Sequence, residues 1–338
     1  MSKVVKVVLI VSGAFLCLGC ILFGIGLLFR NNSESVLDTI NRNLSYTSDD
    51  ISLVEGSIPL EEFDKLNLKY SSIAVTLQQG NEYKLEYKVP EKYIPIVKSN
   101  GDTLSVTQPD VKQNFNISIG IKEKAWEYVI TVPSDEKVYD VNVVFSSGDF
   151  CDSSVDISGL IKLSSGDVTL SHIGFDGSLQ MTSGDTSMSD ITAESLDIDI
   201  SSGDVEIENS DIKNLNYKAT SGKFSAYNLK SENIKTDISS GKIEIVNSNA
   251  YSVYHKETSG EYSAQINGLN DFTFNVTSGS LELETDRKEA DFGYDISRTS
   301  GSLEVGGRGI DGSYIVNPDS ESFIKGKVTS GAAEISFK

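Results

Sequence analysis

A row of aspartates recurs at one point of a repeated tripeptide. Each aspartate follows the glycine of a Ser-Gly pair, and the row consists of Asp149, Asp167, Asp185 and Asp204. This pattern could supply serine nucleophiles beside carboxylates, or carboxylates that share Ca²⁺. Ten Ser-Gly copies with only two histidines in the chain argue against catalytic serines. A calcium-binding solenoid would carry a denser pattern of glycine and aspartate. We therefore expect a solvated row of carboxylates with no metal, cofactor or catalytic residue.

The position after the glycine changes in later repeats. Lys223 and Lys242 occupy it in the next two copies, and Glu261 occupies it in the copy after those. If successive repeats lie side by side, Asp204 neighbours Lys223 and Lys242 neighbours Glu261. Such opposite charges attract across adjacent strands.

The two histidines do not form a site together, because they occupy different places in the repeat. His255 and Glu257 stand at positions that are apolar in most other repeats, so they could mark a groove or a site. We favour instead a local shift of the strand that exposes both side chains. His172 lies in another part of its repeat.

Few other residues suggest chemistry. Trp126 lies at strand spacing in "KAWEYVITV", which favours packing over a sugar-stacking platform. Cys151 stands alone outside the apolar N-terminal segment that contains Cys17 and Cys20, and we expect it to be a small packing residue. With these three cysteines, neither a zinc site nor a Cys-His nucleophile has enough partners.

The elements that position these residues follow from the repeat itself. Ser-Gly, preceded each time by Ser or Thr, recurs with its glycine at 148, 166, 184, 203, 222, 241, 260, 279, 301 and 331. Most steps are 18 or 19 residues, and the last two are 22 and 30. Apolar residues alternate with polar ones on both sides, which is the period of a β-strand. A period this short suits one coil of a β-solenoid and excludes a four-stranded propeller blade.

The fold class expected is therefore all-β, a parallel β-helix-like solenoid of about ten coils with 18–19-residue repeats. Stacking each coil on the last at roughly 4.8 Å gives a rod about 45 Å long. Ser-Gly separates two alternating runs, so it marks the corner where the chain turns. In this register Ile200 is buried between Met181 and Ala219.

Four regions are expected along the chain. Residues 1–30 form a short cytoplasmic tail and a transmembrane helix, and residues 31–58 form a stalk. Residues 59–147 are β-rich and cap or start the solenoid. Residues 148–338 form the regular repeat, and a glycine-rich insertion before the last Ser-Gly serves its C-terminal end.

The membrane anchor is inferred from the uncharged residues 7–29, which are long enough to span a bilayer as a helix. Lys3 and Lys6 precede this run, which favours an N-terminus inside the cell and a C-terminal domain outside it. A cleaved signal peptide, or lipid attachment at Cys20, is the alternative. The apolar run continues beyond Cys20, which favours the uncleaved anchor.

The net charge of the chain restricts the classes of partner it can bind. The formal net charge is −20, and such an acidic surface repels the phosphates of nucleic acid. The partners expected are thus the membrane, through the N-terminal helix, and a cell-envelope glycan or a membrane protein.

The stretch "VITVPSDEKVYDVNVVFSSGDF", with the Ser-Gly-Asp ladder after it, resembles a bacterial family of putative adhesins. The resemblance covers roughly residues 60–338. It implies a cell-surface β-solenoid domain of unknown biochemical function, often membrane-anchored, that is not an enzyme. The function expected is binding or scaffolding outside the membrane. A sensory ectodomain in an envelope stress response is the alternative, and a polysaccharide lyase is a remote one because coils of 18–19 residues leave no room for catalytic loops.

Overall fold

The structure is a computed structural model that describes residues 52–109, 126–133 and 137–338. Within these ranges it contains no helix long and apolar enough to cross a bilayer. The anchor expected in residues 1–30 lies outside the described residues, as does most of the expected stalk. The end of that stalk is a strand of the β-domain, which begins at Leu53 rather than near residue 59.

The β-domain is built from strands and two short 3-10 turns, η1 Glu91–Tyr93 and η2 Glu289–Asp291. The N-terminal strands are β1 Leu53–Pro59, β2 Lys65–Tyr70, β3 Ala74–Gly80, β4 Lys84–Pro90, β5 Ile96–Asn100, β6 Thr103–Thr107, β7 Glu127–Pro133, β8 Tyr139–Ser147 and β9 Phe150–Asp152. The middle strands are β10 Ile157–Ser165, β11 Val168–Ser171, β12 Phe175–Met181, β13 Thr186–Ser189, β14 Thr192–Ile200, β15 Asp204–Glu208, β16 Asp211–Ala219, β17 Lys223–Tyr227 and β18 Lys230–Asn267. The C-terminal strands are β19 Asp271–Val276, β20 Ser280–Thr285, β21 Phe292–Arg298, β22 Ser302–Val305, β23 Arg308–Gly309, β24 Ser313–Val316, β25 Ser322–Val328 and β26 Ala332–Phe337.

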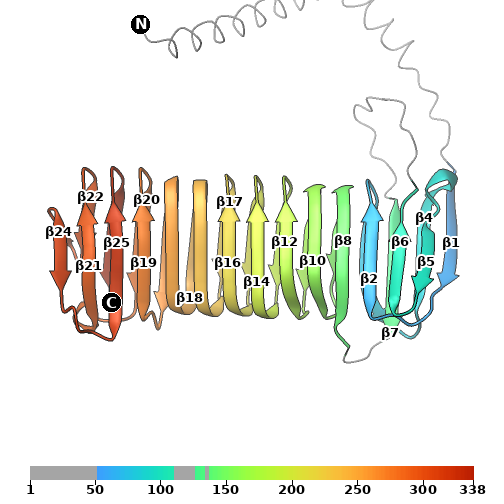
Figure 1. The fold of residues 1–338 in the computed structure, drawn as a ribbon, viewed down its shortest axis with the longest axis horizontal. Helices are drawn as coiled ribbons and strands as arrows, with labels where there is room; N and C mark the ends of the chain where they lie inside the picture. Colours follow the sequence, from blue (N-terminus) through green and yellow to red (C-terminus); the bar gives the residue numbers. More distant parts are fainter. Residues whose placement is uncertain (1–51, 110–125, 134–136) are drawn as a thin grey trace, which may run out of the picture. The chain divides into compact units, whose positions relative to one another are not determined.

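Each coil contributes one strand to each of two parallel columns, as the solenoid prediction requires (Figure 1). The first column includes β8, β10, β12, β14 and β16, and the second includes β9, β11, β13, β15 and β17. Strand β18 runs through two successive coils. Ile200 pairs with Met181 on one side and Ala219 on the other and is 1% exposed, which confirms the register expected from the repeat.

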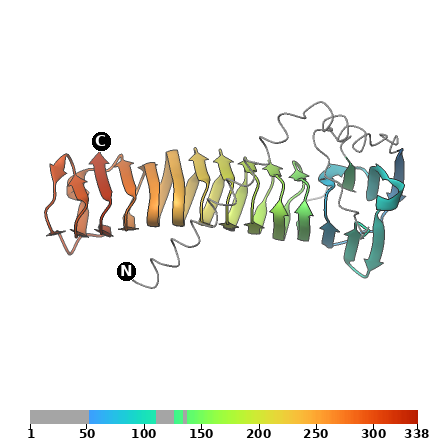
Figure 2. The ribbon, with the colours of Figure 1, turned by 90° about the horizontal axis from the view of Figure 1, so that it is seen from above.

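The core fills the space between the two columns. Tyr217 in β16 and Phe224 in β17 are fully buried, and their ring centroids lie 4.5 Å apart. The columns therefore face each other across an apolar interior. It follows that their outer faces lie on opposite sides of the flattened coil, which Figure 2 shows from above.

Glycine is required at the Ser-Gly corner for two reasons. Gly203 has a φ of 136°, where a side chain is strained. A Cβ atom at Gly203 would also overlap the carbonyl oxygen of Gly184 in the coil before it. The backbones thus approach most closely at this corner, and the hydroxyls of Ser202 and Ser221 lie 3.4 Å apart beside it.

The opposite end of each second-column strand has its own stacked residue. Asn209, Asn228 and Asn247 all adopt a positive φ of 50–55°, which asparagine tolerates better than most residues. The Asn228 amide donates to the Asn209 carbonyl at 2.9 Å, and the Asn247 amide donates to Asn228 at 2.6 Å. The coils are therefore joined by side-chain hydrogen bonds as well as by the backbone.

The order of coils at the two ends differs from the order in sequence, which corrects the expectation that each coil stacks on the last. The coil β25–β26 lies between β19–β20 and β21–β22 (Figure 1). At the other end, the coil β2–β3 lies between β8–β9 and β6–β7. The segment that contains β23 and β24 lets the chain pass the outermost coil and return, because β23 pairs antiparallel with β22 and β24 pairs antiparallel with β21.

Replacing Gly203 by alanine should lower the urea midpoint of unfolding strongly, because the new methyl group collides with the next coil. Gly101→Ala is the matched control, since Gly101 also has a positive φ, 63°, but nothing lies within 4 Å of an added Cβ. We expect a loss of about 1 kcal/mol at Gly101 and at least about 2–4 kcal/mol at Gly203. Equal losses at the two positions would contradict the close stacking of the corners.

Candidate functional site

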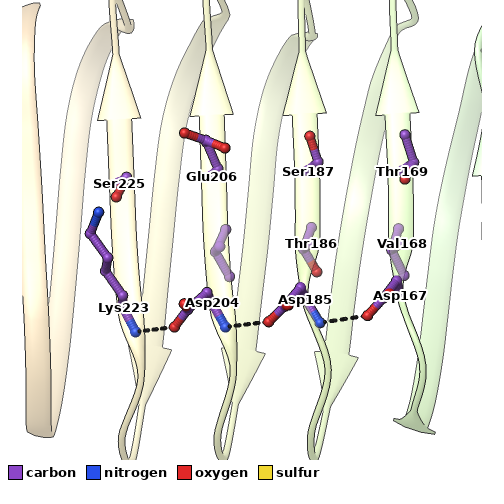
Figure 3. Close-up of a pocket in the computed structure, with 11 residues that line it drawn as sticks. Asp167, Val168, Thr169, Asp185, Thr186, Ser187, Asp204, Glu206, Lys223 and Ser225 are labelled. Carbon is purple, nitrogen blue, oxygen red and sulfur yellow. Dashed lines mark hydrogen bonds between the residues drawn. The ribbon is translucent and has the colours of Figure 1, made fainter.

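The aspartate row lies at the start of the second-column strands and is held by the backbone of neighbouring coils (Figure 3). Each Oδ1 atom accepts a hydrogen bond from the backbone N–H that follows the glycine one coil further on. The donor–acceptor distances are 3.1 Å from Asp167 to Asp149, 2.9 Å from Asp185 to Asp167, 3.2 Å from Asp204 to Asp185 and 3.0 Å from Lys223 to Asp204. A carboxylate beside each corner therefore stabilises the stack, a role that the sequence analysis missed.

Of the two expected charge pairs, Lys242–Glu261 is an ion pair and Asp204–Lys223 is not. Asp204 is in register with Lys223, although the contact uses the Lys223 backbone and the Lys223 ammonium lies 3.3 Å from Glu244. The Lys242 ammonium lies 2.9 Å from the Glu261 carboxylate. Hydrogen bonding to Glu261 and the charge of that carboxylate raise the pKa of Lys242.

A shallow groove runs across four coils beside the row, with a volume of about 330 Å³. Its second set of polar residues stands two residues further along each strand (Figure 3). Of these, Thr169, Ser187 and Glu206 are exposed, whereas Ser225 is buried. Hydroxyl and carboxylate groups at a fixed coil spacing can form hydrogen bonds with a polar ligand that lies along the stack. No three His, Cys, Asp or Glu residues are grouped to hold a metal ion in the part of the chain that the structure describes.

The two histidines differ in their exposure to solvent as well as in their place in the sequence. His172 lies at an outer corner with a φ of 57°, and its side chain is 3.4 Å from the Asp190 carboxylate. His255 is completely buried inside the coil. They do not form a common site.

The expectation that a strand shift exposes His255 and Glu257 is wrong. Both keep the repeat register, opposite Phe274 and Val276, and they are 0% and 1% exposed. The strand keeps its register although only one nitrogen of His255 has a hydrogen-bond partner inside the coil. The His255 Nδ1 atom lies 2.8 Å from the Thr236 hydroxyl, and the Nε2 atom lies 3.4 Å from a Glu257 oxygen.

This buried pair is poorly satisfied. The His255 ring stacks on Tyr262 at 4.0 Å, and neither the Tyr262 hydroxyl nor the Glu257 carboxylate makes a hydrogen bond with described residues. Burial lowers the pKa of His255, and the Glu257 carboxylate acts in the opposite direction.

Asp152 is a second buried acid, and it was not singled out from the sequence. Its Oδ1 atom accepts from the backbone N–H groups of Ser154 and Val155 at 3.1 and 3.0 Å, while its Oδ2 atom has no partner among the described residues. Burial raises the pKa of Asp152 to about 7. The signal that could have found it is its place four residues after Gly148, where the next coil has Leu170.

Cys151 and Trp126 are both expected to be packing residues, and the structure places them differently. Cys151 is partly exposed between the buried residues Phe150 and Asp152, so it lies on the outer side of β9 and does not pack in the core. Trp126 packs against the core and its ring centroid is 5.1 Å from that of Tyr93, which confirms its packing role.

Comparison with known proteins identifies the family. The model of the Toastrack DUF4097 family matches residues 63–312. The chain belongs to this family. A crystal structure of a putative adhesin from Parabacteroides merdae has the same Toastrack fold, with a TM-score of 0.51 and 13% identity over 84% of this chain and 96% of that one. A putative adhesin from Parabacteroides distasonis has a TM-score of 0.48 and 11% identity over the same shares of the two chains. No curated protein matches this Toastrack chain.

Asp152→Asn should stabilise the protein at alkaline pH. The folded state holds the Asp152 proton more tightly than the unfolded state, so stability falls as pH rises from about 4 to about 7. Asparagine keeps the Oδ1 acceptor and removes this dependence of stability on pH. The free energy of unfolding should therefore rise by roughly 2–4 kcal/mol at pH 8. Urea unfolding at pH 5 and pH 8 measures the change, with the exposed Asp176→Asn as control. A gain that is equal at both pH values would show that Asp152 does not titrate in this range.

A double-mutant cycle tests the buried pair. Glu257→Val alone removes the carboxylate that lies 3.4 Å from the His255 Nε2 atom and should destabilise by about 1–3 kcal/mol. The double variant His255→Phe, Glu257→Val copies Phe274 and Val276 of the next coil, so it should be at least as stable as the wild type. The single variants His255→Phe and Glu257→Val are measured separately. If their losses of unfolding free energy add up to the loss in the double variant, the two residues are not directly coupled.

Proposed function

We propose that the chain is a membrane-anchored extracytoplasmic protein whose β-domain is a non-enzymatic binding scaffold. The observation that carries this proposal is the groove beside the aspartate row. Four successive coils present polar side chains there on a backbone whose geometry repeats from coil to coil. A rigid surface of this kind binds a ligand without ordering loops, which lowers the entropic cost of binding.

The ligand we propose is a polar component of the cell envelope, either a glycan or a membrane protein. Hydroxyls and carboxylates line the groove, and these groups form hydrogen bonds with sugar hydroxyls or with peptide groups. A structural neighbour from Parabacteroides merdae is described as a putative adhesin, which supports a binding role.

The location rests on the sequence of the N-terminal segment. Residues 7–29 carry no charge and have the length of a transmembrane helix. Lys3 and Lys6 before the segment favour the cytoplasmic side for the N-terminus. The β-domain then follows on the outer side, where a binding scaffold meets the cell envelope.

The experiment measures binding of the purified full chain to isolated cell envelopes. Ser187→Arg places a long side chain in the groove and should weaken binding about tenfold or more, because it displaces the ligand from the strand surface. Gln180→Arg is the matched control, since it adds the same charge to the other strand column of the same coil. Equal binding by both variants would contradict the groove as the binding surface.

Protease added to intact cells that produce the full chain tests the location of the β-domain. We expect it to digest the β-domain and leave a membrane-bound stub. Digestion only after lysis would contradict the extracytoplasmic location. That outcome would not affect the binding result obtained with isolated envelopes.

A further inference from the structure

The two outer faces of the solenoid differ in charge. The first-column face carries five exposed lysines over neighbouring coils in its C-terminal half, and we call them the basic patch: Lys218, Lys235, Lys256, Lys325 and Lys327. This patch contrasts with the net charge of −20 of the whole chain. The second-column face carries the aspartate row over four coils in its N-terminal half.

The lysines of the basic patch lie on neighbouring coils although they come from distant parts of the sequence, and Asp237 stands among them in register with Lys218. Lys256 is in register with Asn275 of β19, and Asn275 is in register with Lys327 of β25. The inserted coil β25–β26 therefore brings two lysines next to those of β18. From Lys218 to Lys327 the patch spans four coil steps, or about 19 Å.

Most of the patch is unpaired within the chain. Lys256 forms an ion pair with Asp237 at 3.1 Å, and no other lysine of the patch has an acidic partner within 4 Å among the described residues. Lys235 lies over the Tyr254 ring at 5.9 Å, and Lys325 lies over the Phe323 ring at 5.5 Å. Acidic residues limit the patch along the same column, with Asp199 in β14 before it and Asp295 in β21 after it.

The charges of the aspartate row have the same spacing along the solenoid axis as those of the basic patch. Both surfaces present one charge per coil or nearly so, and in both the coils are separated by the same strand spacing of about 4.8 Å. The hydrogen bonds within the row use the Oδ1 atom of each carboxylate. The row residues are exposed, so their charge faces solvent.

We propose that the basic patch of one copy of this chain binds the aspartate row of a second copy, with the two solenoids side by side. The matching spacing lets several lysines meet aspartates at once. The row and the patch occupy different coils, so the copies are staggered along the axis by about 20 Å. Because the two surfaces lie on opposite faces of the coil, the contact is heterologous and does not close into a dimer.

The contact between the two copies consists of exposed ion pairs, and these determine its affinity. A single exposed ion pair contributes little, so association depends on several pairs acting together. These pairs are screened by salt, with a Debye length near 4 Å at about 0.5 M. We expect oligomers that grow with protein concentration at low salt and dissociate at high salt.

Sedimentation velocity of the full chain, in detergent where required, provides the test. The variant Lys235→Glu, Lys325→Glu should weaken association about tenfold or more at low salt. The variant Asp167→Lys, Asp185→Lys should do the same, and lysine is accepted at this place in the coil because Lys223 and Lys242 occupy it. The control Lys69→Glu, Lys162→Glu makes the same charge change on exposed residues of the first column outside the patch, so it should associate like the wild type.

A mixture of the two charge-reversed variants is the decisive sample. The double substitution takes the patch from five positive charges to a net +1, or the row from four negative charges to zero, so each variant alone can combine only one altered surface with one intact surface. In the mixture the intact row of one variant meets the intact patch of the other, so association should return. A wild-type chain that stays monomeric at low salt, or a mixture that fails to associate, overturns the proposal. If the monomer instead binds inorganic polyphosphate and the Lys235→Glu, Lys325→Glu variant does not, the patch serves a foreign polyanion and the proposal is likewise overturned. Envelope binding through the groove is measured separately with Ser187→Arg, so failure of one proposal leaves the other intact.

Discussion

Backbone hydrogen bonding between coils, in strict register, is the constraint on which the rest of this structure depends. A parallel pairing that advances by one repeat keeps every residue beside its equivalent in the next coil. The Ser-Gly corner limits this pairing most, because the backbone of Gly203 leaves no space for a side chain against Gly184. Once the corner is fixed, the direction of each neighbouring side chain follows from the alternation of the strand.

That constraint divides the residues into inner rows and outer rows with different tolerance. Inner rows are apolar because each coil shares its interior with the next. A polar side chain in an inner row must therefore find its partners among adjacent buried residues. His255 is accommodated by Thr236 in the preceding coil and by Glu257 in its own. Outer rows can vary freely, so the lysines and aspartates of the two faces are compatible with one backbone.

The features that depend on the repeat alone could be predicted from the sequence. The buried position of Ile200 and the Lys242–Glu261 pair follow from counting residues between glycines. The burial of His255 could not be predicted in this way, because polarity argued for exposure and only the Thr236 hydroxyl one coil away reverses that argument. The hydrogen bond from each backbone N–H to the preceding aspartate was also hidden, since a side-chain rotamer determines it.

The insertion of the final coil has a consequence for how the protein is made. Strands β21 and β22 leave the ribosome before β25 and β26, yet their place in the stack is beyond them. During translation the outermost layer therefore has no partner, and β19–β20 presents an open edge until β25 and β26 emerge. A chain that stops before β25 would form a solenoid with a missing internal layer and not simply a shorter rod. The stack thus closes only after β25 and β26 have been made, which would let proteases remove chains that lack these strands.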